Sequence, residues 1–110
     1  MAYVYILRCV GGVLYTGITT DIARRLEEHL ARGKSGAKYT RAHPVEGIAA
    51  LWRVSDLREA ARVEWRIKRY PAEKKRILVE TPTLLGGEDF PLPDGISPIP
   101  EELPAISSLL

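Results

Sequence analysis

Hydrophobic residues alternate with polar ones in two short stretches near the amino terminus of this 110-residue chain. Residues 3–8 and 13–19 are rich in Val, Ile, Tyr and Thr, and they flank Gly11-Gly12. Such runs on either side of paired glycines predict a β-hairpin. A third run of this kind spans residues 48–54 and predicts another strand.

The register of the predicted hairpin decides which of its side chains share a face. A strict two-residue turn pairs Arg8 with Tyr15 and leaves Tyr5 on the opposite face. A three-residue loop or a glycine bulge shifts the pairing by one residue and brings both tyrosines to one face. We predict the second arrangement.

Helical periodicity first appears over residues 22–31, and the hydroxyl and carboxylate side chains of residues 19–21 supply N-cap candidates. The apolar stripe of this helix consists of Ile22, Leu26 and Leu30. Arg25 and His29 follow one edge of the stripe. We therefore expect both side chains to border the core without entering it.

A second helix is predicted from the capping box that begins at Asp56 to about residue 69. Its apolar stripe consists of Leu57, Ala60, Val63 and Ile67. Glu64 projects within that stripe, where an unpaired carboxylate would cost several kcal/mol. Its partner is either a cation of the chain, such as Arg25 or Lys68, or a divalent metal ion, which often takes only one or two protein carboxylates.

Charge and proline are distributed unevenly along the chain. All 16 Lys and Arg precede residue 80, so residues 1–80 carry a net charge of +7 and residues 81–110 carry −5. A domain with +7 attracts polyanions such as nucleic acid. Six of the eight prolines follow residue 80, which predicts an irregular tail. We divide the chain into a compact domain, 1–80, and an acidic Pro-rich tail, 81–110.

Pro71 is predicted to begin a third, short helix over residues 71–79. The tail beyond it has two interpretations. Its acidic residues would shield the basic domain and weaken nucleic-acid binding, or its apolar residues would pack on the domain as cladding. Those apolar residues are Leu84, Leu85, Phe90, Leu92 and Ile96.

Cysteine content and the amino-terminal sequence bear on the cellular compartment. Cys9 is the only cysteine, which excludes an intrachain disulfide and fits a reducing cytosol. No basic region followed by a long apolar run begins the chain, and no apolar stretch is long enough to span a bilayer. We therefore predict a cytoplasmic protein without a membrane partner.

Several side chains suit phosphodiester chemistry. Tyr5 and Tyr15 are ordinary strand residues by type, but Gly17 is expected to leave an open patch on the same face for a ligand or another backbone. Arg25 has the planar donor fork that binds phosphate best. His29, one helical turn later, is either a packing residue or a proton acceptor.

The polar segment of residues 33–41 combines cations with one aromatic side chain. It is predicted to grip a nucleic-acid backbone and to stack a base, although a generic polar loop has a similar composition. The predicted contacts are Lys34, Lys38, Tyr39 and Arg41.

Four short motifs at these intervals resemble the GIY-YIG nuclease family. They are Tyr3-Val4-Tyr5, Tyr15-Thr16-Gly17, Arg25 with His29, and Val63-Glu64-Trp65. The resemblance covers about residues 1–80, and it is to the small stand-alone bacterial members and to the catalytic domain of structure-selective branch nucleases. Two positions depart from the family pattern: Tyr3 replaces the first-motif glycine, and Ile18 stands where some relatives carry a lysine.

The resemblance implies an α+β fold, in the broad α/β class, with a small three-stranded antiparallel sheet flanked by helices. It also implies an endonuclease that hydrolyses nucleic-acid phosphodiesters with Mg²⁺ or Mn²⁺ as its cofactor. DNA, branched or single-stranded, is expected as the substrate rather than RNA, in settings such as DNA repair.

Roles for individual residues follow from the same resemblance. Tyr5 would be the general base with help from His29, and Tyr15 would then orient the water or the phosphate. In the alternative, Tyr15 itself would be the general base. Arg25 would stabilise the charge of the transition state, and Glu64 would hold the metal. A phenol with an ordinary pKa near 10 is a poor base at pH 7, so the first role requires local cations to favour the phenolate.

Two other classes of function remain open. A non-catalytic nucleic-acid binding module would keep the fold and the basic surface without cleaving its ligand. An interaction domain would dock its Pro-rich tail on another protein. Because no accessory domain is evident in these 110 residues, substrate choice is also expected to depend on a protein partner, as in a partner-dependent nuclease subunit.

Overall fold

The computed structural model describes residues 1–30 and 44–103. Its strands are β1 (Ala2–Cys9), β2 (Val13–Thr19), β3 (Val45–Val54) and the short β4 (Ile99–Pro100). Its helices are α1 (Ile22–Leu30), α3 (Leu57–Arg69) and α4 (Ala72–Glu80), followed by the 3₁₀ turn η1 (Pro82–Leu84). None of the described helices is long and apolar enough to cross a membrane.

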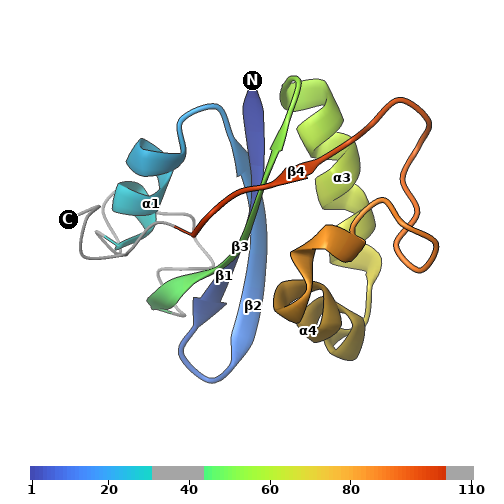
Figure 1. Cartoon of the computed structure of the whole chain (residues 1–110). Coiled ribbons are helices and arrows are strands. Elements are labelled where there is room, and N and C mark those ends of the chain that lie inside the picture. The colour runs from blue at the N-terminus through green and yellow to red at the C-terminus, as the bar shows by residue number, and fades with distance from the viewer. Residues whose placement is uncertain (31–43, 104–110) are drawn as a thin grey trace.

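The strands form one antiparallel sheet in the order β2-β1-β3-β4. Helix α1 covers one face of this sheet, and α3 and α4 lie on the other side (Figure 1). The predicted α+β class is confirmed, but the prediction of three strands is wrong. The fourth strand comes from the tail, where Ile99 and Pro100 pair with Arg53 and Trp52 of β3.

The hairpin has the register that brings the two tyrosines together. Cys9 pairs with Val13 across a three-residue loop, and both glycines of that loop have positive φ. Leu7 therefore pairs with Tyr15, and Tyr5 pairs with Gly17. Because side chains alternate between faces along a strand, Tyr5 and Tyr15 lie on the same face, as predicted.

The two faces of the sheet have separate apolar cores. On the α1 side, the buried residues are Tyr5, Leu7, Cys9, Leu26, Ile48 and Leu51. On the other side, Val4, Ile6 and Trp52 pack with Ala60, Val63 and Ile67 of α3. Tyr5 and Tyr15 thus stand on a sheet that is packed on both sides, and the other candidates lie on the helices that cover it.

Helix α3 begins and ends where the sequence predicts. The Asp56 side chain accepts a hydrogen bond from the backbone N–H of Glu59 at 2.9 Å, and the Glu59 carboxylate accepts one from Ser55 at 3.2 Å. Leu57, predicted in the buried stripe, is 46% exposed because it lies in the first turn, before Ala60 reaches the core. Helix α4 begins at Ala72, with Pro71 as its N-cap.

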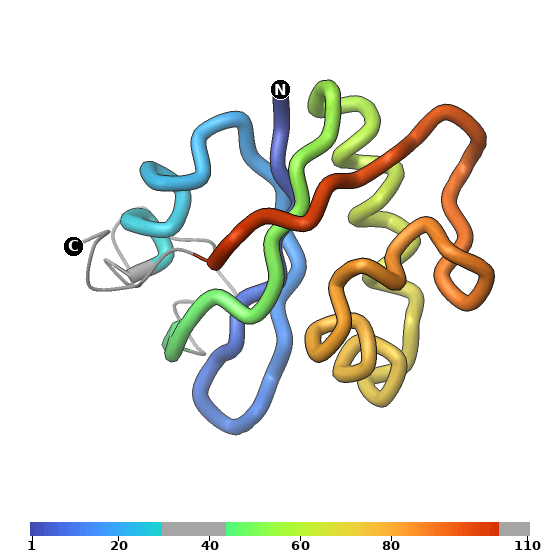
Figure 2. Tube along the Cα trace, viewed as in Figure 1, coloured from blue at the N-terminus to red at the C-terminus, as the bar shows by residue number. Residues whose placement is uncertain are grey.

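The tail packs on the domain, as the cladding interpretation predicts. Figure 2 shows it, in orange to red, looping beside α3 and then crossing β3. Leu85, Phe90 and Ile96 are buried in the core on the α3 side. The Trp52 indole donates a hydrogen bond to the carbonyl of Pro82 at 2.9 Å. This packing favours cladding over a detached acidic shield, while the division of the chain at residue 80 remains a prediction.

Candidate functional site

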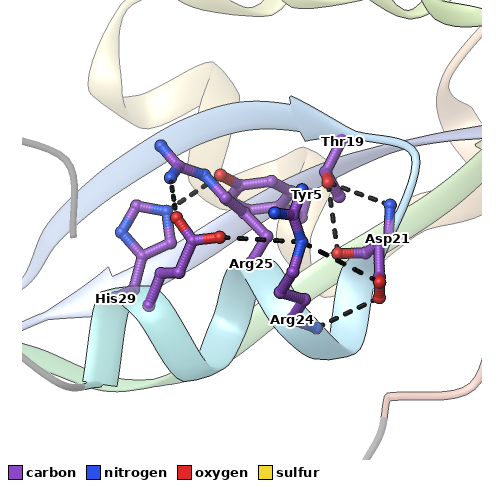
Figure 3. Close-up of polar contacts among 7 residues, drawn as sticks. Tyr5, Thr19, Asp21, Arg24, Arg25 and His29 are labelled. Carbon is purple, nitrogen blue, oxygen red and sulfur yellow. Dashed lines mark hydrogen bonds and ion pairs between the residues drawn. The ribbon is translucent and has the colours of Figure 1, made fainter. Parts of the chain in front are cut away.

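Tyr5, Tyr15 and His29 form a compact aromatic cluster between the sheet and α1. The Tyr5 hydroxyl oxygen lies 2.9 Å from Nε2 of His29, and both side chains are buried. The rings of Tyr5 and Tyr15 stack at 6.5 Å, and the His29 ring meets the Tyr15 ring edge-on at 5.3 Å. Figure 3 shows Tyr5 reaching from β1 toward His29 and Arg25 on α1.

The complete burial of His29 contradicts the expectation that it only borders the core. Helical spacing placed it correctly at the edge of the Ile22 and Leu26 stripe, but spacing reveals nothing about the opposing strand. The hydroxyl of Tyr5 gives the imidazole a buried hydrogen-bond partner, which compensates for its loss of water. Arg25 behaves as predicted, with 27% of its side chain exposed at the border.

Gly17 provides the space that the Tyr5 ring occupies. A Cβ atom built on Gly17 would overlap the Tyr5 hydroxyl and lie 2.5 Å from its Cζ atom. The close approach predicted from this glycine therefore exists, but the group that uses it is a side chain of the same site and not a ligand. Any larger residue at position 17 would push the phenol out of place.

Burial raises the pKa of the Tyr5 phenol to about 12, although the hydrogen bond and positive charge of Arg25 act in the opposite direction. The role of Tyr5 as a phenolate base requires local cations to favour the phenolate, and this condition is not met in this state of the protein. One guanidinium, itself partly exposed, does not outweigh the loss of water around a buried phenol. Tyr5 is neutral at pH 7.

The pKa of His29 is lowered to about 4, chiefly by burial and then by the positive charge of Arg25. The imidazole is consequently neutral at pH 7, with one nitrogen available to accept a proton. The direction of the hydrogen bond between the Tyr5 hydroxyl and Nε2 of His29 depends on the imidazole tautomer. In the tautomer that carries its proton on Nδ1, the Tyr5 hydroxyl donates to Nε2.

Glu28 is a site residue that the sequence interpretation missed. Its carboxylate accepts a hydrogen bond from Nη1 of Arg25 at 2.9 Å, and it lies 3.8 Å from Nε of Arg24. The spacing of three residues between Arg25 and Glu28 on one helix is the signal that would have found it. The contact orients the guanidinium beside Tyr5 (Figure 3).

Glu64 of α3 faces the same region from another element. Its negative charge contributes to the raised pKa of Tyr5, and 23% of its side chain is exposed. Its carboxylate pairs with Lys68 at 3.3 Å, so the alternative of a Glu64–Arg25 ion pair is wrong. Lys68 lies one turn along the same helix, whereas Arg25 is engaged by Glu28.

Glu64 fits the requirements of a Mg²⁺ or Mn²⁺ ligand. Among the described residues, His, Cys, Asp and Glu form no group of three that would hold a metal. Mg²⁺ retains several waters and commonly uses one or two carboxylates plus phosphate oxygens of a substrate. A single, partly exposed carboxylate that acts electrostatically on the Tyr5 phenol meets that pattern. The predicted nucleic-acid contacts Lys34, Lys38, Tyr39 and Arg41 lie outside the described residues.

Residues 1–76 match the family of the GIY-YIG catalytic domain. The chain belongs to the GIY-YIG family. The matched residues of this GIY-YIG domain include all five catalytic candidates, which are Tyr5, Tyr15, Arg25, His29 and Glu64. The four-stranded sheet of this GIY-YIG domain adds β4 from the tail, beyond the matched residues.

Relatives of this GIY-YIG protein are small bacterial proteins of the UPF0213 family. A UPF0213 protein of Cupriavidus necator is 47% identical over 67% of this chain and 78% of its own length. One from Halalkalibacterium halodurans is 46% identical over 77% of this chain and 85% of its own length. The solution NMR structure of the UPF0213 protein from Bacillus halodurans is 44% identical, covers 81% of this chain and 90% of that one, and has a TM-score of 0.47.

The depressed pKa of His29 makes folding stability depend on pH in a defined window. The unfolded chain binds a proton on this histidine below its ordinary pKa of 6.5, whereas the folded protein resists protonation down to about 4. The stabilisation is therefore present above pH 6.5 and is lost as the pH falls toward 4. We expect the unfolding free energy to drop by about 2 kcal/mol between pH 7 and pH 5.

Urea unfolding at the two pH values measures this difference. The His29→Gln variant lacks the titrating group and serves as the control, so its unfolding free energy should change much less over the same interval. An equal drop in both proteins would show that other groups cause the pH dependence.

Proposed function

We propose that this protein is a divalent-metal-dependent endonuclease that hydrolyses phosphodiester bonds in DNA. The observation that carries the proposal is the hydrogen bond of 2.9 Å between the Tyr5 hydroxyl and Nε2 of a neutral, buried His29. Arg25 and Glu64 act electrostatically on the same phenol from two different helices. Membership of the GIY-YIG family supports nuclease chemistry at this cluster.

Tyr5 and His29 would work as a relay for one proton. The Tyr5 oxygen accepts a proton from the attacking water while its own proton moves to Nε2 of His29. This sequence avoids a free phenolate, which the pKa of about 12 makes rare at neutral pH. The neutral imidazole is what permits Tyr5 to act as a base in spite of its burial.

Arg25 and Tyr15 would position the phosphate. Arg25 presents its donors beside the Tyr5 hydroxyl and is held there by Glu28, so it is placed to stabilise charge that develops on the phosphate oxygens. Tyr15 stacks on Tyr5 from the next strand and would orient the water or the phosphate. Glu64 would hold Mg²⁺ or Mn²⁺, which when bound supplies charge neutralisation at the leaving oxygen.

The Glu64–Lys68 pair gives a second candidate function some support. A carboxylate already neutralised by a lysine of its own helix suits a nucleic-acid binding module that cleaves nothing. The +7 charge of residues 1–80 serves binding and cleavage equally. The segment with Lys34, Lys38, Tyr39 and Arg41 is proposed as a nucleic-acid contact in either case.

A cleavage assay with a panel of labelled substrates separates the two candidates. Single-stranded, duplex, flap and four-way-junction DNA, and RNA, are incubated with Mg²⁺, with Mn²⁺ or with EDTA. We expect cleavage of DNA only with metal, and a loss of about 100-fold or more in Glu64→Gln, which keeps the shape of the side chain but not its charge. Glu27→Gln, an exposed carboxylate on α1, should cleave like the wild type.

Other outcomes of the cleavage assay would contradict particular parts of the proposal. Binding without cleavage in every condition would replace the nuclease by the binding module. Cleavage that persists in EDTA, or in Glu64→Gln at the wild-type rate, would remove Glu64 from its proposed role. Preference for RNA over all DNA forms would correct the substrate.

A further inference from the structure

Three pockets follow one another along the outer side of β2, next to α4. The first, of about 300 Å³, lies between Leu14 and Thr16 on the strand and Lys68 and Lys75 on the helices. The second, also about 300 Å³, shares Leu14 and Lys75 with it and extends to Arg76. The third, of about 310 Å³, shares Leu14 and Arg76 with the second. We call this series the basic groove.

The basic groove has a strong excess of positive charge. Its cationic side chains are Arg8, Lys68, Lys75 and Arg76, and the one carboxylate among its described lining residues is Glu80, at the far end. Of these four groove cations, Lys68 is the one that forms an ion pair within the described part of the chain, with Glu64. Arg8, Lys75 and Arg76 thus have no anionic partner among the described residues, which is typical of a surface that binds an external anion.

Thr16 provides an independent sign of a ligand in the first pocket. The residue is 4% exposed, and its hydroxyl oxygen is buried at the pocket wall with no hydrogen-bond partner among the described residues. Buried hydroxyls are normally paired, and a phosphate oxygen is an acceptor that would complete this one. A hydroxyl that donates and two lysines at the same pocket are the usual ligands of a phosphate group.

The basic groove begins beside the candidate site and leads away from it. Tyr15 lines the first pocket and also stacks on Tyr5, so β2 carries both features on neighbouring residues. Lys68 connects the groove to Glu64. Beyond that point the groove runs between α4 and the hairpin loop, where Gly12 and Arg76 line the same pocket.

We propose that the basic groove binds the sugar-phosphate backbone of the substrate strand over several nucleotides to one side of the bond that is cut. This inference rests on the proposed function, because it takes the position of the cut from the Tyr5 cluster. The groove is a row of small pockets lined by cations, and Tyr15 is the one aromatic among its described lining residues, so it contacts the phosphates of one strand and does not read bases.

The test is the salt dependence of binding for Lys75→Ala/Arg76→Ala. A fluorescein-labelled oligothymidylate is titrated in EDTA, so that nothing is cut, and anisotropy gives the affinity from low to physiological salt. The loss of two phosphate contacts should flatten the slope of log K against log salt by about 1.4, since each contact on single strands contributes about 0.7. Affinity at low salt should fall by about tenfold or more.

Arg58→Ala/Arg62→Ala is the matched control, because it removes the same charge from exposed positions of α3. Its slope should stay close to that of the wild type. If both double variants flattened the slope of log K against log salt equally, the groove proposal would be overturned. The net charge of the domain would then account for binding. If poly-L-glutamate at equal charge concentration displaced the oligonucleotide, the proposal of a nucleic-acid groove would be overturned in favour of an acidic protein partner.

Cleavage kinetics distinguish a failure of the groove from a failure of the proposed function. If the wild type cuts DNA, the groove variant should raise KM about tenfold and leave kcat nearly unchanged, because the contacts hold substrate and transition state equally. If the groove variant left both KM and the salt slope of binding unchanged, the groove proposal would be overturned and the proposed nuclease function would be retained. A wild type that binds with the predicted slope difference but never cuts would keep the groove and overturn the nuclease.

Discussion

Gly17→Ala should lose about 2 to 3 kcal/mol of folding stability and about 100-fold of cleavage activity in one substitution. The added Cβ would lie 2.5 Å from Cζ of Tyr5, a separation that atoms do not adopt, so the phenol or the strand must move. Movement of Tyr5 breaks its hydrogen bond to His29 and displaces the proposed base. Thermal unfolding and the cleavage assay measure the two losses.

Gly47→Ala is the natural control for this experiment. Gly47 lies in β3, the other neighbour of β1, and a Cβ there would meet nothing within 4 Å. Its stability should be equal to or slightly above that of the wild type, because alanine reduces the entropy of the unfolded chain. A Gly17→Ala protein as stable and active as Gly47→Ala would contradict the close approach of Tyr5.

A double-mutant cycle tests whether the Tyr5 ring causes the loss of stability in Gly17→Ala. In a Tyr5→Leu background the phenol ring is absent, so Gly17→Ala should cost less than about 1 kcal/mol. A cost that stays the same in both backgrounds would place the strain in the strand and not in the ring.

Truncation after Glu80 should abolish cooperative folding. Leu85, Phe90 and Ile96 are buried against the sheet and α3, and each such side chain stabilises the fold by about 1.5 to 3 kcal/mol. Their combined loss is comparable to the whole stability of a small domain, about 5 to 15 kcal/mol. Urea unfolding and the dispersion of amide NMR signals measure the outcome, with a chain of residues 1–103 as the control.

Point substitutions test the same packing in the full chain. Phe90→Ala should cost about 3 to 5 kcal/mol, because the ring is 2% exposed. Leu103→Ala should cost little, because that side chain is 48% exposed. If residues 1–80 folded cooperatively and bound DNA more tightly than the full chain, the tail would be an acidic shield and the cladding interpretation would be wrong.

The sequence predicts those parts of the fold that depend on neighbouring residues. The paired glycines set the hairpin register, and the capping box set the start of α3 at Leu57. By contrast, β4 consists of two residues and includes Pro100, so no periodicity could reveal it. It exists because the Glu101 backbone N–H donates to Leu51 and its side chain pairs with Arg53, contacts about fifty residues apart along the chain.

In the candidate site too, some features follow from local sequence and others depend on contacts between distant segments. The residue types and spacings were sufficient to choose Tyr5, Tyr15, Arg25, His29 and Glu64 as candidates. Burial of His29 and the high pKa of Tyr5 both arise from the packing of α1 onto the sheet, which no single segment encodes. The number of nearby cations in the sequence does not reveal that desolvation of the phenol exceeds the influence of Arg25.

The late position of the tail contacts has a consequence for the order of events during synthesis. The five catalytic candidates have all been translated by residue 64, but Trp52 and its neighbours stay uncovered until Pro82, Phe90 and Glu101 have left the ribosome. Chains emerge at about 5 to 20 residues per second, so the nascent domain spends on the order of seconds with an open core. A nascent chain would therefore complete the packing beneath its candidate site only after residues 82–101 have emerged, later than the last of the five candidates.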